Sequence, residues 1–244
     1  MSNRVRAVVT GASSGLGVEF CRQLADCCDE IVLVARTESA LVELAKELGV
    51  NGVEAHIVVA DLTKMIDLTR VVETIRQKGP FQYLINNAGF STLGPFVKQQ
   101  PQLQHDMVAL HITAAIELCS AALGGMIEQG KGVVVNVSSL TALLPMAQVA
   151  VYGGTKAFLN NYSEALQSEV AKQGIKIQSL CPGYIRTAFH ATDSFAGFDV
   201  SRVPDEMWME AKDVVAESLA ALASGPVVYV AGEYNRNLLA TMTK

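Results

Sequence analysis

The chain has 244 residues, of which 50% are apolar, and it carries a formal net charge of −5. This length and composition are typical of a folded chain with a large buried core and argue against disorder. The small negative charge argues against a surface that binds nucleic acid or an anionic membrane.

The cysteine pattern and the N-terminal segment narrow the class of protein further. The five cysteines are odd in number and lack paired C-x-x-C spacing, so we expect reduced thiols rather than a disulfide framework or a metal site. The N-terminus shows no signal-peptide pattern, and no apolar run reaches the roughly 18 to 20 residues of a membrane span. The sequence therefore predicts a cytoplasmic protein with no metal and no membrane or nucleic-acid partner.

Short β-rich runs alternate along the chain with longer segments of helical periodicity. Strands are expected over residues 5–10, 31–35, 56–60, 83–86, 133–137, 175–180 and 227–230. Helices are expected over residues 15–26, 38–48, 66–78, 103–129, 151–173 and 205–223, followed by a short amphipathic end. This β-α-β-α order predicts an α/β fold of the doubly wound (Rossmann) class, with a parallel sheet and helices on both faces.

The first strand is followed by a glycine-rich turn that opens the first helix. The turn contains Gly11, Ser13, Ser14, Gly15, Leu16 and Gly17. Glycines allow backbone N–H groups to approach a ligand closely, and the positive end of a helix favours an anion. An ordinary tight turn also uses glycine, but the position between a strand and a helix of a βαβ unit favours a site for the pyrophosphate of a dinucleotide.

The second strand ends in Ala35, and Arg36 follows it. An acidic residue at this position of such a fold bonds the ribose hydroxyls of NAD, whereas a guanidinium can hold a 2′-phosphate. The sequence therefore favours NADP(H) over NAD(H). The alternative is that Arg36 is a solvated charge at the end of a strand.

Polar residues follow the fourth and fifth strands, at the carboxyl ends that line the ligand crevice of a parallel sheet. After the fourth strand, Asn87 offers an amide to backbone or ribose groups, and Gly89 allows close approach to a cofactor, although both are also ordinary turn residues. At the end of the fifth strand, a hydroxyl of Ser138 or Ser139 can bond a substrate oxygen and stabilise charge in the transition state.

The next helix carries Tyr152 and Lys156, which lie four residues apart on one face. Reduction of a carbonyl group needs a proton for the developing alkoxide, and a phenol with a usual pKa of about 10 can supply it. A nearby ammonium favours the phenolate, so Lys156 is expected to lower the pKa of Tyr152 by roughly three units. The spacing alone occurs often by chance.

Six motifs in this order and spacing resemble the short-chain dehydrogenase/reductase family. They are residues 10–17, 61–62, 86–89, Ser139, 152–156 and 182–187, and the resemblance covers nearly the whole chain. It implies one dinucleotide-binding domain over residues 1–244, built on a seven-stranded parallel sheet in three α/β/α layers.

The resemblance also implies roles for individual residues. Tyr152 would be the general acid/base, Lys156 would bind the nicotinamide ribose and lower the pKa of the tyrosine, and Ser139 would polarise the carbonyl group. The other residues implied at the cofactor are Asp61 and Leu62 near the adenine, Ala88 beside Asn87, and Pro182, Gly183, Ile185 and Thr187 after the sixth strand. Arg36 resembles the arginine that selects NADP.

One position departs from the family pattern. The family usually has an asparagine in the middle of the long helix, where it is thought to hold a water of the proton relay, and this chain has His111 there. Histidine can donate, accept or carry a proton. We expect His111 to join the relay, and the alternatives are a structural role and weakened activity.

The segment after the sixth strand is expected to cover the substrate. A lid is predicted over about residues 188–210, with Phe189, Phe195 and Phe198 forming an apolar pocket or, equally, packing the loop onto the core. Small residues on the helices over 103–129 and 151–173 fit helix pairing in a homodimer or homotetramer, and they also fit burial against the sheet of the same chain.

The predicted function is hydride transfer between NADP(H) and a carbonyl or secondary alcohol, on an apolar ketone, aldehyde or 3-oxoacyl-like substrate. The alternative is a cofactor-binding protein of the same fold with little turnover, acting as a sensor or assembly partner. A nucleoside-sugar epimerase is disfavoured because the chain lacks a sizeable C-terminal substrate domain.

Overall fold

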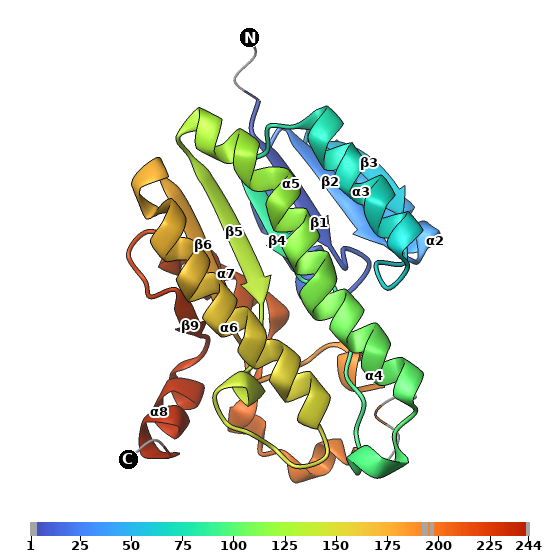
Figure 1. Cartoon of the computed structure of the whole chain (residues 1–244), viewed down its shortest axis with the longest axis vertical. Coiled ribbons are helices and arrows are strands. Elements are labelled where there is room, and N and C mark those ends of the chain that lie inside the picture. The colour runs from blue at the N-terminus through green and yellow to red at the C-terminus, as the bar shows by residue number, and fades with distance from the viewer. Residues whose placement is uncertain (1–3, 192–194, 196–197, 243–244) are drawn as a thin grey trace.

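Seven parallel strands form the central sheet of the computed structural model, which describes residues 4–191, 195 and 198–242 (Figure 1). The strand order in the described part is β3-β2-β1-β4-β5-β6-β9. The strands are β1 (Arg6–Thr10), β2 (Glu30–Ala35), β3 (Glu54–Val59), β4 (Tyr83–Asn86), β5 (Gly132–Val137), β6 (Ile175–Cys181) and β9 (Val228–Val230). The order reverses between β1 and β4, and this reversal leaves a crevice beyond the carboxyl ends of these two strands.

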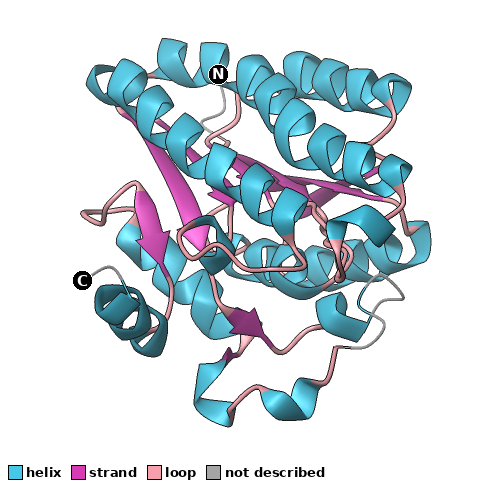
Figure 2. Cartoon of the chain, turned by 60° about the horizontal axis from the view of Figure 1, so that its bottom comes forward, coloured by secondary structure: helices cyan, strands magenta, loops and turns pink. Residues whose placement is uncertain are grey.

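Hydrophobic cores lie on both faces of the sheet because successive strand residues point to opposite sides. Ala7 and Val9 of β1 belong to one core, and Val8 between them belongs to the other. Helices α1 (Gly15–Leu24), α2 (Glu38–Val50) and α7 (Ala211–Ala221) cover the first core, and α3 (Met65–Lys78), α5 (Ala114–Gln129) and α6 (Ala150–Val170) cover the second. Figure 2 shows the sheet between the two helix layers. The predicted three-layer α/β fold with a seven-stranded parallel sheet is confirmed.

The long helix predicted over residues 103–129 is not continuous. The structure has α4 (Pro101–Val108), a π-helical turn (Ala109–Thr113) and then α5. The wider turn holds one extra residue, which periodicity averaged over a long apolar helix does not detect. It directs the ring of His111 into the interior, where it is 2% exposed.

The same helical run corrects the prediction that no apolar segment reaches the length of a membrane span. Residues Pro101–Gln129 contain an 18-residue window with a mean hydropathy of 1.6, of which 39% is buried in the fold. A core helix passes this test of length and composition as readily as a membrane helix does. Here Leu118 and Met126 of α5 pack into the second core, between this helix and the sheet.

The helix predicted over residues 205–223 begins later than expected. A 3₁₀ turn (Asp205–Met207) is followed by β8 (Trp208–Met209), which pairs in parallel with β7 (Tyr184–Ile185). The backbone N–H of Arg186 donates to the carbonyl oxygen of Met209 at 3.0 Å, so this backbone is already paired before α7 begins at Ala211.

Short elements complete the chain around the carboxyl end of the sheet. The 3₁₀ helices are Phe96–Lys98, Leu140–Ala142, Ala171–Gln173, Ala188–Ala191 and Val200–Arg202, and the amphipathic end forms α8 (Glu233–Met242). The described parts of the predicted lid therefore contain short helical turns and β8. Residues 192–194 and 196–197 of that lid lie outside the described residues.

Candidate active site

A cavity of about 690 Å³ lies beyond the carboxyl ends of the central strands. Its lining brings together most of the predicted site residues: Gly11, Ser13, Ser14, Gly15, Leu16, Arg36, Asp61, Leu62, Asn87, Ala88, Gly89, Ser139, Tyr152, Lys156, Pro182, Gly183, Ile185 and Thr187. Two predicted residues, Gly17 and His111, do not line the cavity. The others, which span 177 positions from the first to the last (11 to 187), thus meet at one place.

Thr10 ties the glycine turn to the turn after β4. Its Oγ1 accepts hydrogen bonds from the backbone N–H groups of Asn87 and Ala88, each at 3.0 Å, and donates to the carbonyl oxygen of Ile85. The side-chain amide of Asn87 in turn donates to the carbonyl oxygen of Thr10 at 2.8 Å. The two turns that form this wall of the cavity are therefore fixed to each other.

The first turn of α1 leaves no room for a side chain at Gly17. A Cβ there would collide with the carbonyl group of Gly11 and lie 2.7 Å from the amide nitrogen of Asn87. This close packing directs the start of α1, at Gly15 and Leu16, toward the cavity that both residues line. Backbone N–H groups at a helix N-terminus favour an anion, as a pyrophosphate would be.

The end of β2 and the end of β3 form the outer rim of the cavity. Arg36 is exposed there, one residue beyond the end of β2. Burial by itself would raise the pKa of Asp61, but hydrogen bonds from the hydroxyl and N–H groups of Thr63 and the positive charges of Arg36 and Lys64 lower it below its usual value. Asp61 is thus a fixed carboxylate beside an exposed guanidinium.

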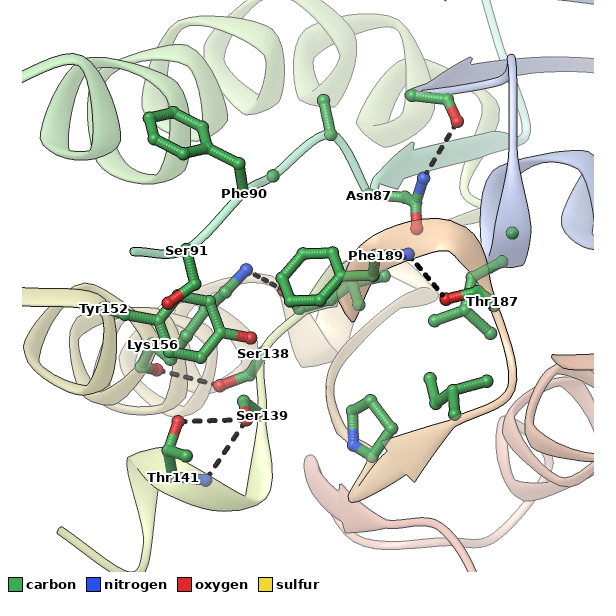
Figure 3. A pocket seen from close by; sticks show the side chains of 18 of the residues that line it. Asn87, Phe90, Ser91, Ser138, Ser139, Thr141, Tyr152, Lys156, Thr187 and Phe189 are labelled. Carbon is green, nitrogen blue, oxygen red and sulfur yellow. Dashed lines mark hydrogen bonds between the residues drawn. The ribbon is translucent and has the colours of Figure 1, made fainter. Parts of the chain in front are cut away.

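The inner end of the cavity holds the hydroxyl of Ser139 and the phenol of Tyr152 (Figure 3). Ser139 follows β5, and its Oγ accepts hydrogen bonds from the backbone N–H of Thr141 at 3.2 Å and from the Thr141 hydroxyl at 2.9 Å. Both acceptor positions of Ser139 are occupied, so its own hydroxyl proton is left to donate to another oxygen. The neighbouring Ser138 instead donates to the backbone carbonyl oxygen of Lys156 at 2.9 Å.

The ammonium of Lys156 is buried under the tyrosine. Its Nζ donates to the carbonyl oxygen of Val137 at 2.7 Å and lies 5.6 Å from the centre of the Tyr152 ring. Burial lowers the pKa of Lys156 to about 7. Burial also raises the pKa of Tyr152 to about 12, against the opposing effect of a hydrogen bond with Ser139.

These directions differ from the prediction that Lys156 lowers the pKa of Tyr152. Burial disfavours the charged form of both groups, and Lys156 directs its ammonium toward a backbone carbonyl rather than toward the phenol. At neutral pH the phenol of Tyr152 therefore keeps its proton.

His111 has partners at both ring nitrogens. Nε2 lies 3.2 Å from the backbone nitrogen of Phe90, and Nδ1 lies 2.8 Å from the hydroxyl oxygen of Thr155. Burial, and then the charge of Lys156, hold the pKa of His111 well below its usual value. Its part in a proton relay stays a prediction.

Aromatic side chains of the lid segment form the opposite wall. The Phe189 ring lies 6.3 Å from that of Tyr152 and 5.5 Å from that of Phe195, measured between ring centres. The backbone N–H of Phe189 donates to the hydroxyl of Thr187 at 3.3 Å (Figure 3). These contacts bring the lid against the catalytic tyrosine candidate.

Sequence reasoning missed the contribution of α8 to this cavity. Leu238 and Met242 line it, one helical turn apart, and so does Asn235. Asn235 is buried, and its amide donates to the carbonyl oxygen of Ala231 at 2.8 Å. The i, i+4 spacing of Leu238 and Met242 was the available signal, but only the fold shows that this helix lies over the site.

One cysteine, Cys181, adjoins the site, where burial raises its pKa and hydrogen bonds with Ser138 and with the backbone of Ser139 oppose this. All five cysteines are free thiols. Among the described residues, no group of three or more His, Cys, Asp and Glu side chains is arranged to hold a metal ion.

Sequence comparisons find related proteins over most of the chain. The family model described as short chain dehydrogenase matches residues 5–195. The inactive hydroxysteroid dehydrogenase-like protein 1 of Pongo abelii is 34% identical over 194 residues, which are 78% of this chain and 58% of that protein. The chain thus spans less than two thirds of the length of that relative.

Solved structures match over nearly the full length. The short-chain dehydrogenase of Sphingobium yanoikuyae in complex with NADPH is 30% identical and has a TM-score of 0.86, over 98% of this chain and 93% of that chain. The bulky-bulky ketone specific alcohol dehydrogenase of Comamonas testosteroni is 29% identical and has a TM-score of 0.83, over 99% of this chain and 93% of that chain.

Proposed function

The chain belongs to the short-chain dehydrogenase family, and from this premise we propose that it transfers hydride between NADP(H) and a carbonyl compound or secondary alcohol. The observation that carries the proposal is the meeting of Ser139, Tyr152 and Lys156 with the glycine turn in one cavity. Membership of this family supports the proposal that the chain is an oxidoreductase. The choice of NADP, the substrate and the roles of single residues are further parts of the proposal.

The cavity fits a nicotinamide dinucleotide. The start of α1 offers N–H groups to a pyrophosphate, and the close packing at Gly17 leaves the backbone open to the ligand. Arg36 on the rim is placed to hold a 2′-phosphate, although a solvated charge at a strand end would look the same. The bound nicotinamide supplies or accepts the hydride. The Sphingobium yanoikuyae relative was solved in complex with NADPH, which supports the choice of cofactor.

In the reduction direction, Tyr152 donates its proton to the carbonyl oxygen. The phenol is protonated at neutral pH and therefore holds the proton to be donated, while the burial that raises its pKa to about 12 makes it a weaker acid than a free phenol. Ser139, whose acceptor positions are occupied by Thr141, donates a hydrogen bond to the same oxygen and orients it, and it keeps its own proton. Lys156, whose Nζ donates to the carbonyl oxygen of Val137, is proposed to bind the ribose of the nicotinamide through a remaining N–H donor.

The substrate is proposed to be bulky and apolar. Phe189 and Phe195 of the lid and Leu238 and Met242 of α8 form apolar walls beside the catalytic groups. The Comamonas testosteroni relative is described as specific for bulky-bulky ketones, and this supports a ketone with two large substituents. We further propose that residues 1–244 form one domain and that residues 188–210 act as the lid that excludes water during hydride transfer.

We also propose that the chain forms a homodimer or homotetramer, with the exposed side of α4 and α5 as the interface between copies. Val108, Ile116 and Ile127 are 38–40% exposed there, on a helical run that is otherwise strongly apolar. Exposed apolar helix faces of this kind mark protein–protein contacts. Light scattering on the purified protein measures the oligomeric state, and a monomer would contradict the proposal. The cytoplasmic location stays a prediction.

The test of the function follows NADPH absorbance with a panel of bulky ketones, aldehydes and 3-oxoacyl thioesters. We expect turnover of at least one bulky ketone, lost by about 10³-fold or more in Tyr152→Phe and retained in Tyr162→Phe, a control on the same helix. Tight NADPH binding without turnover of any of these compounds would favour the second candidate, a cofactor-binding protein with little turnover. That candidate is supported by the relatives described as inactive.

For the cofactor, kcat/KM is compared between NADPH and NADH. Arg36→Ala is expected to reduce the preference for NADPH by about tenfold, the loss of one charge-assisted contact. A tenfold preference of the unmodified protein for NADH would contradict the proposal.

A further inference from the structure

His111 lies where two parts of the active site meet. It comes from the π-helical turn between α4 and α5, and its ring reaches both the turn after β4 and the first turns of α6. We propose that His111 is a positioning residue that fixes the backbone of Tyr152 to the turn after β4, and that it carries no proton in the reaction. This inference rests on the proposed function, because it assigns a role within the same site.

The hydrogen bonds around the ring determine which nitrogen holds the proton. The backbone N–H of Phe90 is a donor, so Nε2 must accept and is unprotonated. The hydroxyl of Thr155 already donates to the carbonyl oxygen of Tyr152 at 2.8 Å, so it must accept from Nδ1. Both constraints give the same form, a neutral imidazole with its proton on Nδ1.

The hydrogen bonds that join Phe90, His111 and Thr155 form a bridge across the site. A second proton on the His111 ring would break it. Protonated Nε2 would face the N–H of Phe90, so two donors would oppose each other. The charged groups and titratable groups that face the ring among the described residues, Lys156 and Tyr152, both come from α6. A cationic Lys156 opposes a second positive charge, and burial disfavours it further.

The bridge reaches the catalytic tyrosine by a short path. From Nδ1 of His111 the path runs through the Thr155 hydroxyl to the carbonyl oxygen of Tyr152, with two contacts of 2.8 Å. The His111 ring also meets the Tyr152 ring edge-on, with ring centres 5.8 Å apart and an angle of 77°. Both contacts restrict where the phenol can lie.

The other end of the bridge sets the turn that approaches the cofactor. A Cβ at Gly89 would lie 2.9 Å from Nε2 of His111 and 3.5 Å from Nζ of Lys156. The turn therefore passes close between the two side chains, and only a glycine fits there. Removal of the imidazole would loosen this turn and the tyrosine together, because one ring contacts both.

The first experiment determines which ring nitrogen of His111 carries the proton. Protein labelled with ¹⁵N at its four histidines is studied by long-range ¹H–¹⁵N correlation, with and without NADPH, and the His111 resonances are assigned from their loss in His111→Asn. We expect Nδ1 protonated and Nε2 unprotonated from pH 5.5 to pH 9. Titration of His111 near pH 6 to 7, or a proton on Nε2, would overturn the assignment.

The second experiment separates the two ends of the bridge. Asparagine keeps a donor near the position of Nδ1, glutamine keeps an acceptor near the position of Nε2, and leucine keeps neither. We expect kcat to fall by about 10- to 100-fold in His111→Leu and by less in His111→Asn and His111→Gln, the size typical of a misplaced catalytic group. The Kd for NADPH should stay within about threefold and the midpoints of the pH profile should not move, because no proton carrier is lost.

Two further measurements keep a positioning role apart from a loss of folding or of a proton carrier. Thr155→Val should lower kcat as much as His111→Leu does, and the double variant should lower it no further, because residues that act as a unit are not additive. Thr155→Ser keeps the hydroxyl and should keep the original rate. Added imidazole should not restore turnover in His111→Ala. Rescue by imidazole, or full kcat in His111→Leu, would overturn the proposal. If the unmodified protein reduces no carbonyl compound, the proposed function fails, and the NMR measurement still tests the proton position.

Discussion

The two halves of the active site are held in place by different kinds of contact. On the cofactor side, strand ends and backbone groups define the wall: Thr10 binds two N–H groups of the next turn, and Gly17 packs directly on a carbonyl. On the substrate side, ring contacts of Phe189 and ion pairs of Arg186 hold the lid segment. The cofactor wall thus depends on short polar side chains bonded to the backbone and on the lack of a side chain at Gly17, whereas the substrate wall depends on ring packing and surface ion pairs.

This difference implies that the substrate side can change without disturbing the cofactor side. His111 is the exception, because it touches Phe90 on one side and Thr155 on the other. Substitutions on the cofactor side should therefore change the Kd for NADPH, and substitutions on the substrate side should change kcat/KM for the ketone, with the other constant unaffected. The predictions below test that separation, from the largest expected effect to the smallest.

Gly17→Ala should have the largest effect, and only on the cofactor side. The new Cβ meets the backbone of Gly11, which cannot move away as a side chain would, so α1 and the glycine turn must separate. We expect the Kd for NADPH, measured by fluorescence titration, to rise by about 100-fold. Gly49→Ala on α2 is the control, because a Cβ there meets nothing within 4 Å. Unchanged NADPH affinity in Gly17→Ala would contradict the backbone account of this wall.

Phe189→Ala should affect the substrate side alone. The truncation removes the ring contacts with Tyr152 and Phe195 and opens the apolar wall. Loss of a large aromatic side chain costs a few kcal/mol when it is buried, and this ring is half-buried, so we expect kcat/KM for a bulky ketone to fall by about 10- to 30-fold. The Kd for NADPH should not change.

Phe96→Ala serves as the control for this truncation. Phe96 is 62% exposed and is not one of the residues that line the cavity. Its truncation should therefore leave kcat/KM for the ketone and the Kd for NADPH unchanged. A parallel rise in the NADPH Kd of Phe189→Ala would show that the two halves are coupled through the lid.

Lys156→Met should remove a pH dependence of stability. Burial lowers the pKa of Lys156 from 10.5 to about 7, so between these values the unfolded chain binds a proton that the folded chain does not. The free energy of unfolding therefore rises with pH above about 7, by at most about 1.4 kcal/mol per pH unit from this group. Urea unfolding of the cofactor-free protein at pH 7.5 to 9 measures the slope, because below about pH 7 the lowered pKa of His111 adds a slope of the same sign.

The slope should disappear in Lys156→Met and persist in Lys131→Met, a control at an exposed lysine. The window ends near pH 9, because burial raises the pKa values of Cys21 and Cys28 and so opposes folding at higher pH. An unchanged slope in Lys156→Met would mean that the buried ammonium does not titrate there.

Arg186→Ala should have the smallest effect. Its guanidinium pairs with Asp205 at 2.9 Å and Glu210 at 3.5 Å and lies over the Trp208 ring, but the side chain is 45% exposed. Exposed ion pairs contribute about 0–1 kcal/mol, so we expect the KM for a ketone to rise by no more than about threefold. The more exposed Arg202→Ala is the control and should not change KM. A tenfold effect of Arg186→Ala would mark these pairs as the main support of the lid.

The sequence predicted best what depends on local pattern. The strands and most helices followed from apolar runs and periodicity, whereas the roles of Ser139, Tyr152 and Lys156 came from the resemblance to the family and stay predictions. The π-helical turn at residues 109–113 was missed because one inserted residue leaves the average period of a long helix almost unchanged.

The start of α7 and the place of α8 could not be predicted for a different reason. Residues 207–209 are apolar enough for a helix, but they pair with β7, a contact with residues far away in the chain. Leu238 likewise lines the cavity because α8 packs against the distant 3₁₀ turn Asp205–Met207, a contact that the sequence near Leu238 does not predict. Long-range packing, rather than propensity, decides such segments.

The only tryptophan of the chain, Trp208, lies on β8 within the proposed lid segment. Its ring centre is 5.3 Å from that of Tyr184, the Arg186 guanidinium lies over it, and its indole N–H donates to the carbonyl oxygen of Val203 at 3.3 Å. All intrinsic indole emission therefore originates from one place beside the substrate wall. Its wavelength and its quenching by energy transfer to a reduced nicotinamide would give an optical record of lid position without any attached dye.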